Sequence, residues 1–332
     1  MPESRIGFRT RNWWPAALLA LLTVGAILLG ALLSSGFIIG SRTDVGWTQP
    51  TALDAGHIPG LTTTFVAFGD TGTGDRQQFR VAEGIEGICE SSGCDLALGL
   101  GDNFYPDGVR ARSDPQFQTK FEKPFAALQM PFYMVLGNHD VEQPKSARAQ
   151  ISYASGRWKM PARWYSFRVG PVRFVALDTN RVAASDKDGQ LSWIKETLAA
   201  RSDAVWTIVF GHHPLYSNGG HGDARGAGRD WLHEAICDSG AVDLYLAGHD
   251  HALQWLAPKP ASCRHTEFIV SGAGARPRAL ADRNHSEHFA RGHTSGFFWF
   301  QAMGESLTGH VYDADGTLLF ARTLLKTDRL TH

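Results

Sequence analysis

The longest apolar stretch of the chain, residues 13–39, lies in a gap without charged residues between Arg11 and Arg42. It is long enough for a helix that spans a bilayer, which needs about 20 apolar residues. Because arginines cluster on its N-terminal side, the positive-inside rule predicts that residues 1–12 are cytoplasmic and that the chain after the span lies outside the cytoplasm, periplasmic or extracellular. We therefore expect an uncleaved transmembrane signal anchor; a signal peptide, which has a shorter apolar core, would be cleaved and release a secreted protein.

Beyond residue 60 the pattern changes to short runs of β-branched and aromatic residues, each ending in a glycine followed by polar residues. Runs of this length and composition predict buried strands. Five of them are Thr62–Phe68, Leu96–Leu100, Phe132–Leu136, Val205–Phe210 and Val242–Ala247. Helical patterns follow several of the runs, and this alternation is typical of a sheet that contains parallel strands.

A helix is expected after the first of these runs, because Asp75 is a good N-cap residue. The apolar positions that keep helical spacing there are Phe79, Ala82, Ile85 and Ile88. Two hairpins are expected as well, one over Trp164–Asp178 and one over Phe297–Leu324, with the second turning at Asp315-Gly316.

These elements predict an α/β fold, a mixed β-sandwich flanked by helices and preceded by one N-terminal transmembrane helix. No proline-rich or serine-rich linker divides residues 61–332, so they are expected to form a single domain. Residues 40–60 are expected to be a spacer between the membrane and that domain.

The composition and net charge of the chain exclude several classes of protein. The chain has 332 residues, is 43% hydrophobic and 20% charged, and carries a formal net charge of −1. These values describe a globular protein with a full core and exclude a disordered or collagen-like chain. Lysines and arginines do not outnumber the acidic residues and form no long basic run, so no nucleic-acid partner is expected.

Export to an oxidising compartment favours disulfide bonds between the four cysteines. Their positions favour the pairs Cys89–Cys94 and Cys237–Cys263, although four cysteines allow three pairings and four unpaired core cysteines are the alternative.

Residues typical of metal ligands follow all five predicted strands. One Gly-Asp pair after a strand is usually a turn. Five such clusters are different, since the carboxyl ends of strands in an α/β sheet meet in one crevice. Carboxylate, amide, imidazole and phenol groups are ligands that suit iron, manganese or zinc. The sequence thus predicts a metal site at the ends of these strands.

The clusters resemble the five motifs of the calcineurin-like metallophosphoesterases, and the resemblance covers about residues 61 to 325. The motifs are Asp70-Thr71-Gly72, Gly101-Asp102-Asn103-Phe104-Tyr105, Gly137-Asn138-His139-Asp140, Gly211-His212 and Gly248-His249-Asp250-His251. The first motif usually reads Asp-x-His, but Gly72 stands at its third position and Tyr105 appears in the second motif. This paired change resembles the purple acid phosphatases, and the stretch from Gly101 to Glu122 is similar to the small, tartrate-resistant type.

The resemblance implies two metal ions that share Asp102. The first, Fe(III), would be held by Asp70, Asp102, Tyr105 and His251. The second, Fe(II), Zn or Mn, would be held by Asp102, Asn138, His212 and His249.

The activity implied by the resemblance is acid phosphatase action on small phosphate monoesters, with direct attack by a metal-bound hydroxide. His139 and His221 match positions that contact the phosphate or protonate the leaving alkoxide, although His221 could instead be a solvent-exposed loop histidine. His213 is expected to pack beside the ligands rather than to bind metal. A phosphodiesterase or nucleotide pyrophosphatase with the same centre is the alternative, and an inactive scaffold at the membrane is a third interpretation.

The segment from Arg276 to His293 is rich in arginine and histidine and follows a predicted strand, Thr266–Ser271. Charge-rich loops are usually solvated surface. Because guanidinium groups pair well with phosphate oxygens, this segment could instead line the mouth of the substrate site.

Overall fold

The computed structural model describes residues 51–53, 62–180, 184–257, 263, 265–281 and 283–327. All of them belong to a compact unit that spans Gly46–His332. The predicted cytoplasmic segment 1–12 and the predicted membrane span 13–39 lie outside the described residues. Among the residues that are described, no helix combines the length and the apolar character needed to cross a bilayer.

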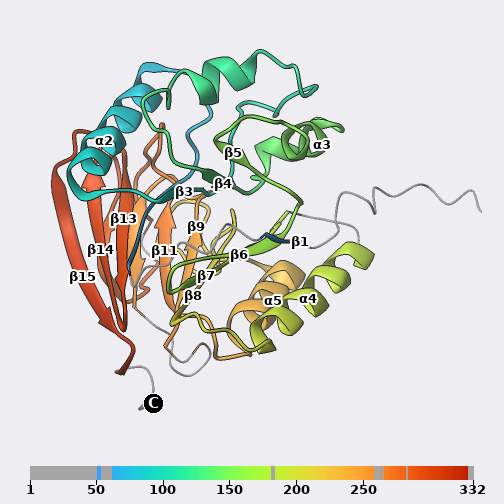
Figure 1. Ribbon diagram of the computed structural model, residues 1–332, viewed down its shortest axis with the longest axis vertical. Helices are drawn as coiled ribbons and strands as arrows, with labels where there is room; N and C mark the ends of the chain where they lie inside the picture. Colours follow the sequence, from blue (N-terminus) through green and yellow to red (C-terminus); the bar gives the residue numbers. More distant parts are fainter. Residues whose placement is uncertain are drawn as a thin grey trace, which may run out of the picture. The chain divides into compact units, whose positions relative to one another are not determined.

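Two β-sheets form the centre of this unit (Figure 1). The first has eight strands in the order β1 (Thr51–Leu53), β6 (Tyr165–Val169), β7 (Val172–Ala176), β8 (Trp206–Phe210), β9 (Leu244–Ala247), β11 (Glu267–Ser271), β10 (Leu253–Leu256) and β12 (Glu287–Arg291). The second has seven in the order β15 (Leu318–Leu325), β14 (Ser306–Asp313), β13 (Gly296–Met303), β2 (Thr62–Phe68), β3 (Leu96–Gly99), β4 (Phe132–Met134) and β5 (Trp158–Lys159). Both sheets are mixed, with β2, β3 and β4 parallel in one and β7, β8 and β9 parallel in the other.

Aromatic side chains join the inner faces of the two sheets. The Phe65 ring from β2 meets the Phe174 ring from β7 edge to face, with centroids 5.2 Å apart. The Trp255 ring from β10 lies 6.0 Å from the Phe300 ring of β13. All four side chains are fully buried. Because side chains alternate across a strand, the opposite face of each sheet also needs a cover.

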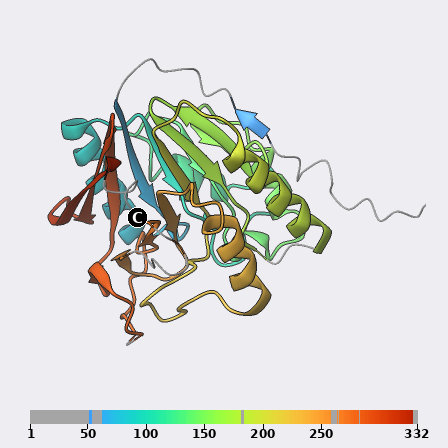
Figure 2. The same ribbon diagram turned by 90° about the horizontal axis from the view of Figure 1, so that it is seen from below.

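Helices supply that cover. They are α2 (Arg76–Ser92), α3 (Ser146–Ile151), α4 (Ala184–Ala199) and α5 (Gly226–Ile236), with a short π-helix at Gln118–Glu122 and a 3₁₀ turn at His139–Val141. Figures 1 and 2 show α4 and α5 side by side on the outer face of the first sheet. There Val209 and Tyr245, from β8 and β9, pack with Ile236 of α5 in a second apolar core. The predicted mixed α/β fold with helices on its sheets is confirmed.

Most local predictions agree with the structure. The five predicted strands are present as β2, β3, β4, β8 and β9, and the first hairpin is the β6–β7 pair. Asp75 caps α2 by accepting hydrogen bonds from the backbone N–H groups of Gln77 and Gln78. Both expected disulfides, Cys89–Cys94 and Cys237–Cys263, are formed.

One apolar position of the predicted helix lies at the surface. Phe79 of α2 is 36% exposed, whereas Gln78 is fully buried. The Gln78 amide satisfies its hydrogen bonds inside, donating to the carbonyl of Lys120 and accepting from the N–H of Gly74. Because its amide group has both a hydrogen-bond acceptor and a donor beside it, Gln78 can be buried although it is polar.

The second hairpin is also more complex than expected. Phe297–Leu324 contains three strands, because β13 turns into β14 at Gly304-Glu305 before the predicted turn at Asp315-Gly316. Gly304 has φ 54°, which a tight two-residue turn requires. Four strands were not expected. β1 lies inside the predicted spacer, where it pairs with β6, and β12 lies inside the arginine-rich segment. The other two are the short strands β5 and β10.

Candidate metal centre

The predicted ligand residues come together where the parallel strands of both sheets end. Asp70 follows β2, Asp102 follows β3 and Asn138 follows β4, while His212 and His249 follow β8 and β9 of the other sheet. The loops are tied to each other by backbone hydrogen bonds, from Asp70 N–H to the carbonyl of Gly101 and from Gly248 N–H to that of His212. The two sheets thus present their ligand-type residues at one shared edge.

Three of these residues have a left-handed backbone. Their φ values are 59° at Asp70, 53° at Asp102 and 66° at His249. Non-glycine residues adopt this region rarely, and such residues cluster at functional sites. At these three turns the side chains of Asp70, Asp102 and His249 lie close to the other ligand residues at the ends of the strands.

Gly72 explains the unusual first motif. A Cβ atom at this position would lie 2.2 Å from the carbonyl carbon and oxygen of Asn103. The carbonyl of Gly72 accepts a hydrogen bond from the N–H of Tyr105 at 2.9 Å. The missing side chain at position 72 is therefore what allows the loop that carries Tyr105 to approach the centre.

Four side chains form a first ligand-type group around the Tyr105 hydroxyl. This oxygen lies 3.0 Å from Asp102 Oδ2, 3.2 Å from Asp70 Oδ1 and 3.3 Å from His251 Nε2. His251 Nε2 is in turn 3.3 Å from Asp70 Oδ1. All four residues are buried.

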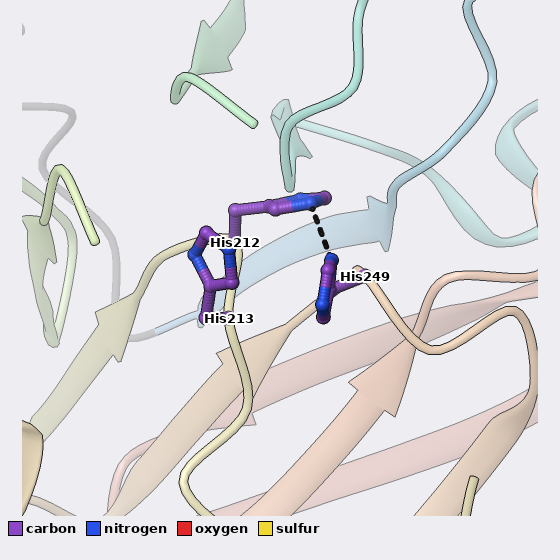
Figure 3. A group of neighbouring side chains, drawn as sticks. All are labelled: His212, His213 and His249. Atoms are coloured by element: carbon purple, nitrogen blue, oxygen red, sulfur yellow. Dashed lines mark hydrogen bonds between the residues drawn. The ribbon is translucent and has the colours of Figure 1, made fainter. Parts of the chain in front are cut away.

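A second group surrounds His212. Its Nε2 lies 3.1 Å from Asn138 Oδ1, 3.2 Å from His249 Nδ1 and 3.5 Å from Asp102 Oδ1. Figure 3 shows the His212 and His249 rings turned toward each other from the loops after β8 and β9. Asp102 directs Oδ2 to the first group and Oδ1 to the second, so this carboxylate joins the two.

Backbone carbonyls orient two of the imidazoles. His212 Nδ1 lies 2.8 Å from the carbonyl of Leu100, and His251 Nδ1 lies 2.7 Å from the carbonyl of Arg276. A carbonyl only accepts, so each Nδ1 is the donor and a neutral ring presents its Nε2 lone pair to the centre. The lone pair on His212 Nε2 faces Asn138 Oδ1 and Asp102 Oδ1, which are also hydrogen-bond acceptors. Acceptors this close repel one another unless a proton or a cation lies between them.

The pKa shifts of the ligand residues also indicate that a proton or a cation is needed among them. Burial raises the pKa of Tyr105, and the Asp70 and Asp102 carboxylates raise it further. Burial also raises the pKa of Asp102, against the effect of His212. Burial lowers the pKa of His249, and the neighbouring imidazoles of His212 and His213 lower it further. A bound cation would reverse the direction for the acidic groups. The donor set therefore fits two metal ions.

His213 lies next to the second group. It offers a ring nitrogen within 4.8 Å of those of His212 and His249. Its Nδ1 is 2.8 Å from Thr179 Oγ1, and its ring packs on that of His249 with centroids 4.5 Å apart. These contacts agree with the packing position expected for this residue.

A cavity of about 210 Å³ opens over both groups. Its lining includes His139, His221, Arg276 and Arg278 together with ligand-type residues of the two groups. His139 Nδ1 lies 2.5 Å from the carbonyl of Pro106, and His221 Nε2 lies 3.3 Å from Arg278 Nη1. His221 is exposed, as its alternative interpretation expected, but it faces this cavity.

The arginine-rich segment divides into two parts. Arg276 and Arg278 line the cavity, with the Arg276 guanidinium 5.6 Å from the centre of the Tyr105 ring. Arg283 instead donates to the carbonyls of Gly219 and Gly220, and Arg291 is at the surface in β12. Of the four arginines in the segment, Arg276 and Arg278 therefore line the cavity, and Arg283 and Arg291 do not.

Three supporting residues were not predicted. Asp140 is fully buried and accepts hydrogen bonds from the N–H groups of Asn103, Phe104 and Gly137. Asp250 accepts from the N–H groups of His221 and Gly222, while Thr179 Oγ1 accepts from those of His212 and His213. Asp140 and Asp250 stand inside the motifs, but their partners are backbone groups that leave no pattern in the sequence.

One other group of ligand-type residues occurs in the described part of the chain, namely His233, Cys237 and Cys263. Its two sulfur atoms are bonded to each other, so it has no thiolate to offer a metal.

Comparisons with known proteins agree with this geometry. The family model described as calcineurin-like phosphoesterase matches residues 63–253. The chain is 30% identical to tartrate-resistant acid phosphatase type 5 of Mus musculus over 316 residues, which cover 83% of this chain and 94% of that protein. It is 32% identical to purple acid phosphatase 17 of Arabidopsis thaliana over 240 residues, which cover 64% and 68%.

Solved structures share the fold. GAP50, the anchor in the inner membrane complex of Plasmodium, aligns with a TM-score of 0.69 at 22% identity, over 80% of this chain and 89% of that chain. Purple acid phosphatase PPD1 from yellow lupin, Lupinus luteus, aligns with a TM-score of 0.65 at 18% identity, over 84% and 54%. With its family model, its relatives and its ligand-type groups in agreement, the chain belongs to the calcineurin-like phosphoesterases and, within them, to the purple acid phosphatases of the small, tartrate-resistant type, which are metal-dependent phosphoester hydrolases.

Proposed function

We propose that the protein hydrolyses phosphate monoesters of small molecules with a dinuclear centre of Fe(III) and a divalent ion. The observation that carries the proposal is the pair of ligand-type groups that share Asp102 under one cavity. Asp70, Asp102, Tyr105 and His251 would hold Fe(III), and Asp102, Asn138, His212 and His249 would hold Fe(II), Zn or Mn.

The two donor sets differ in charge, which supports this assignment. A phenolate and two carboxylates suit a trivalent ion, whereas a neutral amide and two imidazoles suit a divalent one. When bound, a metal pair supplies Lewis acidity toward the phosphoryl group and acidifies water. The chain's own residues then have to bind and orient the phosphate and supply a proton to the leaving oxygen.

Four residues of the cavity wall can do this. The guanidinium groups of Arg276 and Arg278 are planar, and the spacing of their N–H donors matches that of phosphate oxygens. His139 donates through Nδ1 to the carbonyl of Pro106, so its Nε2 is left to face a phosphate or an alkoxide. His221 is held by the bond from its N–H to Asp250 Oδ1. A histidine at either position can deliver a proton to the leaving alkoxide.

The charge of this wall favours monoesters over diesters. A phosphate monoester carries up to two negative charges, and a diester carries one. Two arginines beside the cavity would therefore stabilise the bound monoester more strongly.

The test compares p-nitrophenyl phosphate with bis(p-nitrophenyl) phosphate on the full chain, together with metal analysis. We expect kcat/KM to be at least about 100-fold higher for the monoester, a difference of about 2.7 kcal/mol, and about one iron per chain beside one further metal ion. Preference for the diester would favour a phosphodiesterase or nucleotide pyrophosphatase. Full metal content without activity would favour the scaffold interpretation, and activity without iron would contradict the ferric site.

We further propose that residues 13–39 anchor the protein in a membrane with the catalytic domain, residues 61–332, outside the cytoplasm. The two disulfides support an oxidising compartment. After cell fractionation and a high-salt wash, phosphatase activity is expected to stay with the membranes. Soluble activity from a chain that has lost its first residues would indicate a cleaved signal peptide instead.

A further inference from the structure

A second, larger cavity of about 480 Å³ lies beside the metal centre. It shares Asn138 and His249 with the cavity over the two ligand-type groups. Two cavities that share lining residues are neighbours. With its phosphate in the smaller cavity, a substrate would hold its alcohol part next to the larger one.

The wall away from the centre is apolar. It consists of Trp231 and Leu232 from α5, Ala224 from the loop before that helix, and Val141 from the 3₁₀ turn that begins at His139. Trp231 is half-buried and packs against the apolar core beneath α5, which limits the freedom of the indole. A held indole ring with aliphatic neighbours is suited to a flat, apolar group.

Several polar residues of the same cavity are already bonded, either to each other or to a neighbouring side chain. Asp178 pairs with Arg163 at 2.5 Å and accepts from the amide of Asn180 at 2.9 Å. Thr179 bonds to His213, as described above. Arg225, the remaining charged residue of the lining, is exposed. The bonded polar groups leave the indole, its aliphatic neighbours and the exposed Arg225 as the main groups that this cavity offers to a ligand.

We infer that this cavity is a leaving-group subsite that selects phosphate monoesters whose alcohol carries a flat, uncharged aromatic ring, with Trp231 as its specificity-determining residue. The inference rests on the proposed function, because it assumes that the phosphate binds over the metal centre. It predicts that the enzyme prefers an aromatic ester over an aliphatic one because of contacts with the alcohol part alone.

The test uses two esters with alkoxides of similar basicity, 2-phenylethyl phosphate and propyl phosphate, so that the chemical step is matched. Burying a phenyl ring is expected to raise kcat/KM of the full-length, metal-loaded enzyme about tenfold or more for the aromatic ester. Trp231→Ala is expected to remove most of this preference and to leave kcat/KM for propyl phosphate within about twofold.

A second variant tests the cavity without removing a packed side chain. A Cβ atom at Gly228, which lines the cavity within α5, would meet no atom within 4 Å. Gly228→Leu therefore fits the helix and fills part of the cavity, so it is expected to lower activity on the aromatic ester alone. Gly189→Leu is the matched control, since Gly189 is an exposed glycine of α4 with equally open surroundings that does not line the cavity.

Binding of the corresponding phosphonates, measured by calorimetry, gives a readout that does not need turnover. Tighter binding of 2-phenylethylphosphonate than of propylphosphonate, lost in Gly228→Leu and kept in Gly189→Leu, is the expected result. Equal binding of both phosphonates, or equal loss of both in Gly228→Leu, overturns the subsite. An enzyme that hydrolyses neither ester but binds the aromatic phosphonate more tightly would contradict the proposed function and leave the subsite standing.

Discussion

Asp102→Asn is expected to reduce kcat/KM by at least about 10³-fold, or about 4 kcal/mol of transition-state stabilisation, and to reduce metal content to one ion or fewer per chain. The reason is geometric, because the two oxygens of this carboxylate face different ligand-type groups, Oδ2 toward Tyr105 and Oδ1 toward His212. An amide keeps the shape of the side chain but loses its charge, and its nitrogen cannot bind a cation. Metal analysis and steady-state kinetics on the same preparation measure both effects.

Asp243→Asn is the control for the loss of a buried carboxylate. Asp243 is also fully buried, and it accepts hydrogen bonds from the N–H of Thr207 and from Lys326. This variant is expected to lose stability while keeping its metal ions and its kcat/KM per folded molecule. Full metal content and near-normal activity in Asp102→Asn would contradict the shared role of Asp102.

Tyr105→Phe is expected to abolish the broad visible absorption band of the iron-loaded protein. The Tyr105 hydroxyl is within 3.3 Å of three other members of the first group, so it would bind the ferric ion directly. Burial and two carboxylates raise the pKa of this hydroxyl, and only a cation of high charge would keep it ionised at ordinary pH. The visible spectrum, recorded with the iron content of each sample, measures the effect.

Tyr133→Phe provides a matched control. Tyr133 is a buried tyrosine whose pKa is also raised by burial, but its ring stacks on Phe167 in the core. This variant is expected to keep the band. Retention of the band in Tyr105→Phe, or a colourless but active wild-type protein with zinc or manganese, would show that Tyr105 does not bind iron.

Local sequence signals were sufficient for the strands and the ligand-type residues. A run such as Thr62–Phe68 is followed directly by Gly69 and Asp70, residue types that are common in turns, so the end of the strand can be recognised from the sequence. Asp75 likewise carries its own capping signal. The position after such strands singled out the clusters, and the resemblance of these clusters to the purple acid phosphatase motifs implied the set of seven ligand-type residues.

Elements that depend on distant partners could not be predicted in this way. β12 has no buried residue among its five, so it shows no alternation and exists through its pairing with β10. β1 has three residues, too few to form a recognisable pattern, and pairs with β6. At the centre, the carbonyls of Leu100 and Arg276 orient two histidines, and a carbonyl is present at every position of any sequence. The larger cavity depends on how α5 lies against the loops after β4 and β7, which no local pattern describes.

The left-handed backbone at Asp70, Asp102 and His249 has a consequence for mutational mapping of the centre. Alanine adopts this conformation at a cost of about 1 kcal/mol or more, whereas asparagine and aspartate accept it more readily. In an alanine scan, the loss of stability at each position would therefore combine the strain of alanine in a left-handed turn with the loss of the side chain. Such a scan would overstate how much the three side chains contribute to stability. Asparagine preserves the turns, so asparagine substitutions at these three positions separate the chemical contribution of each side chain from the conformational contribution of its backbone.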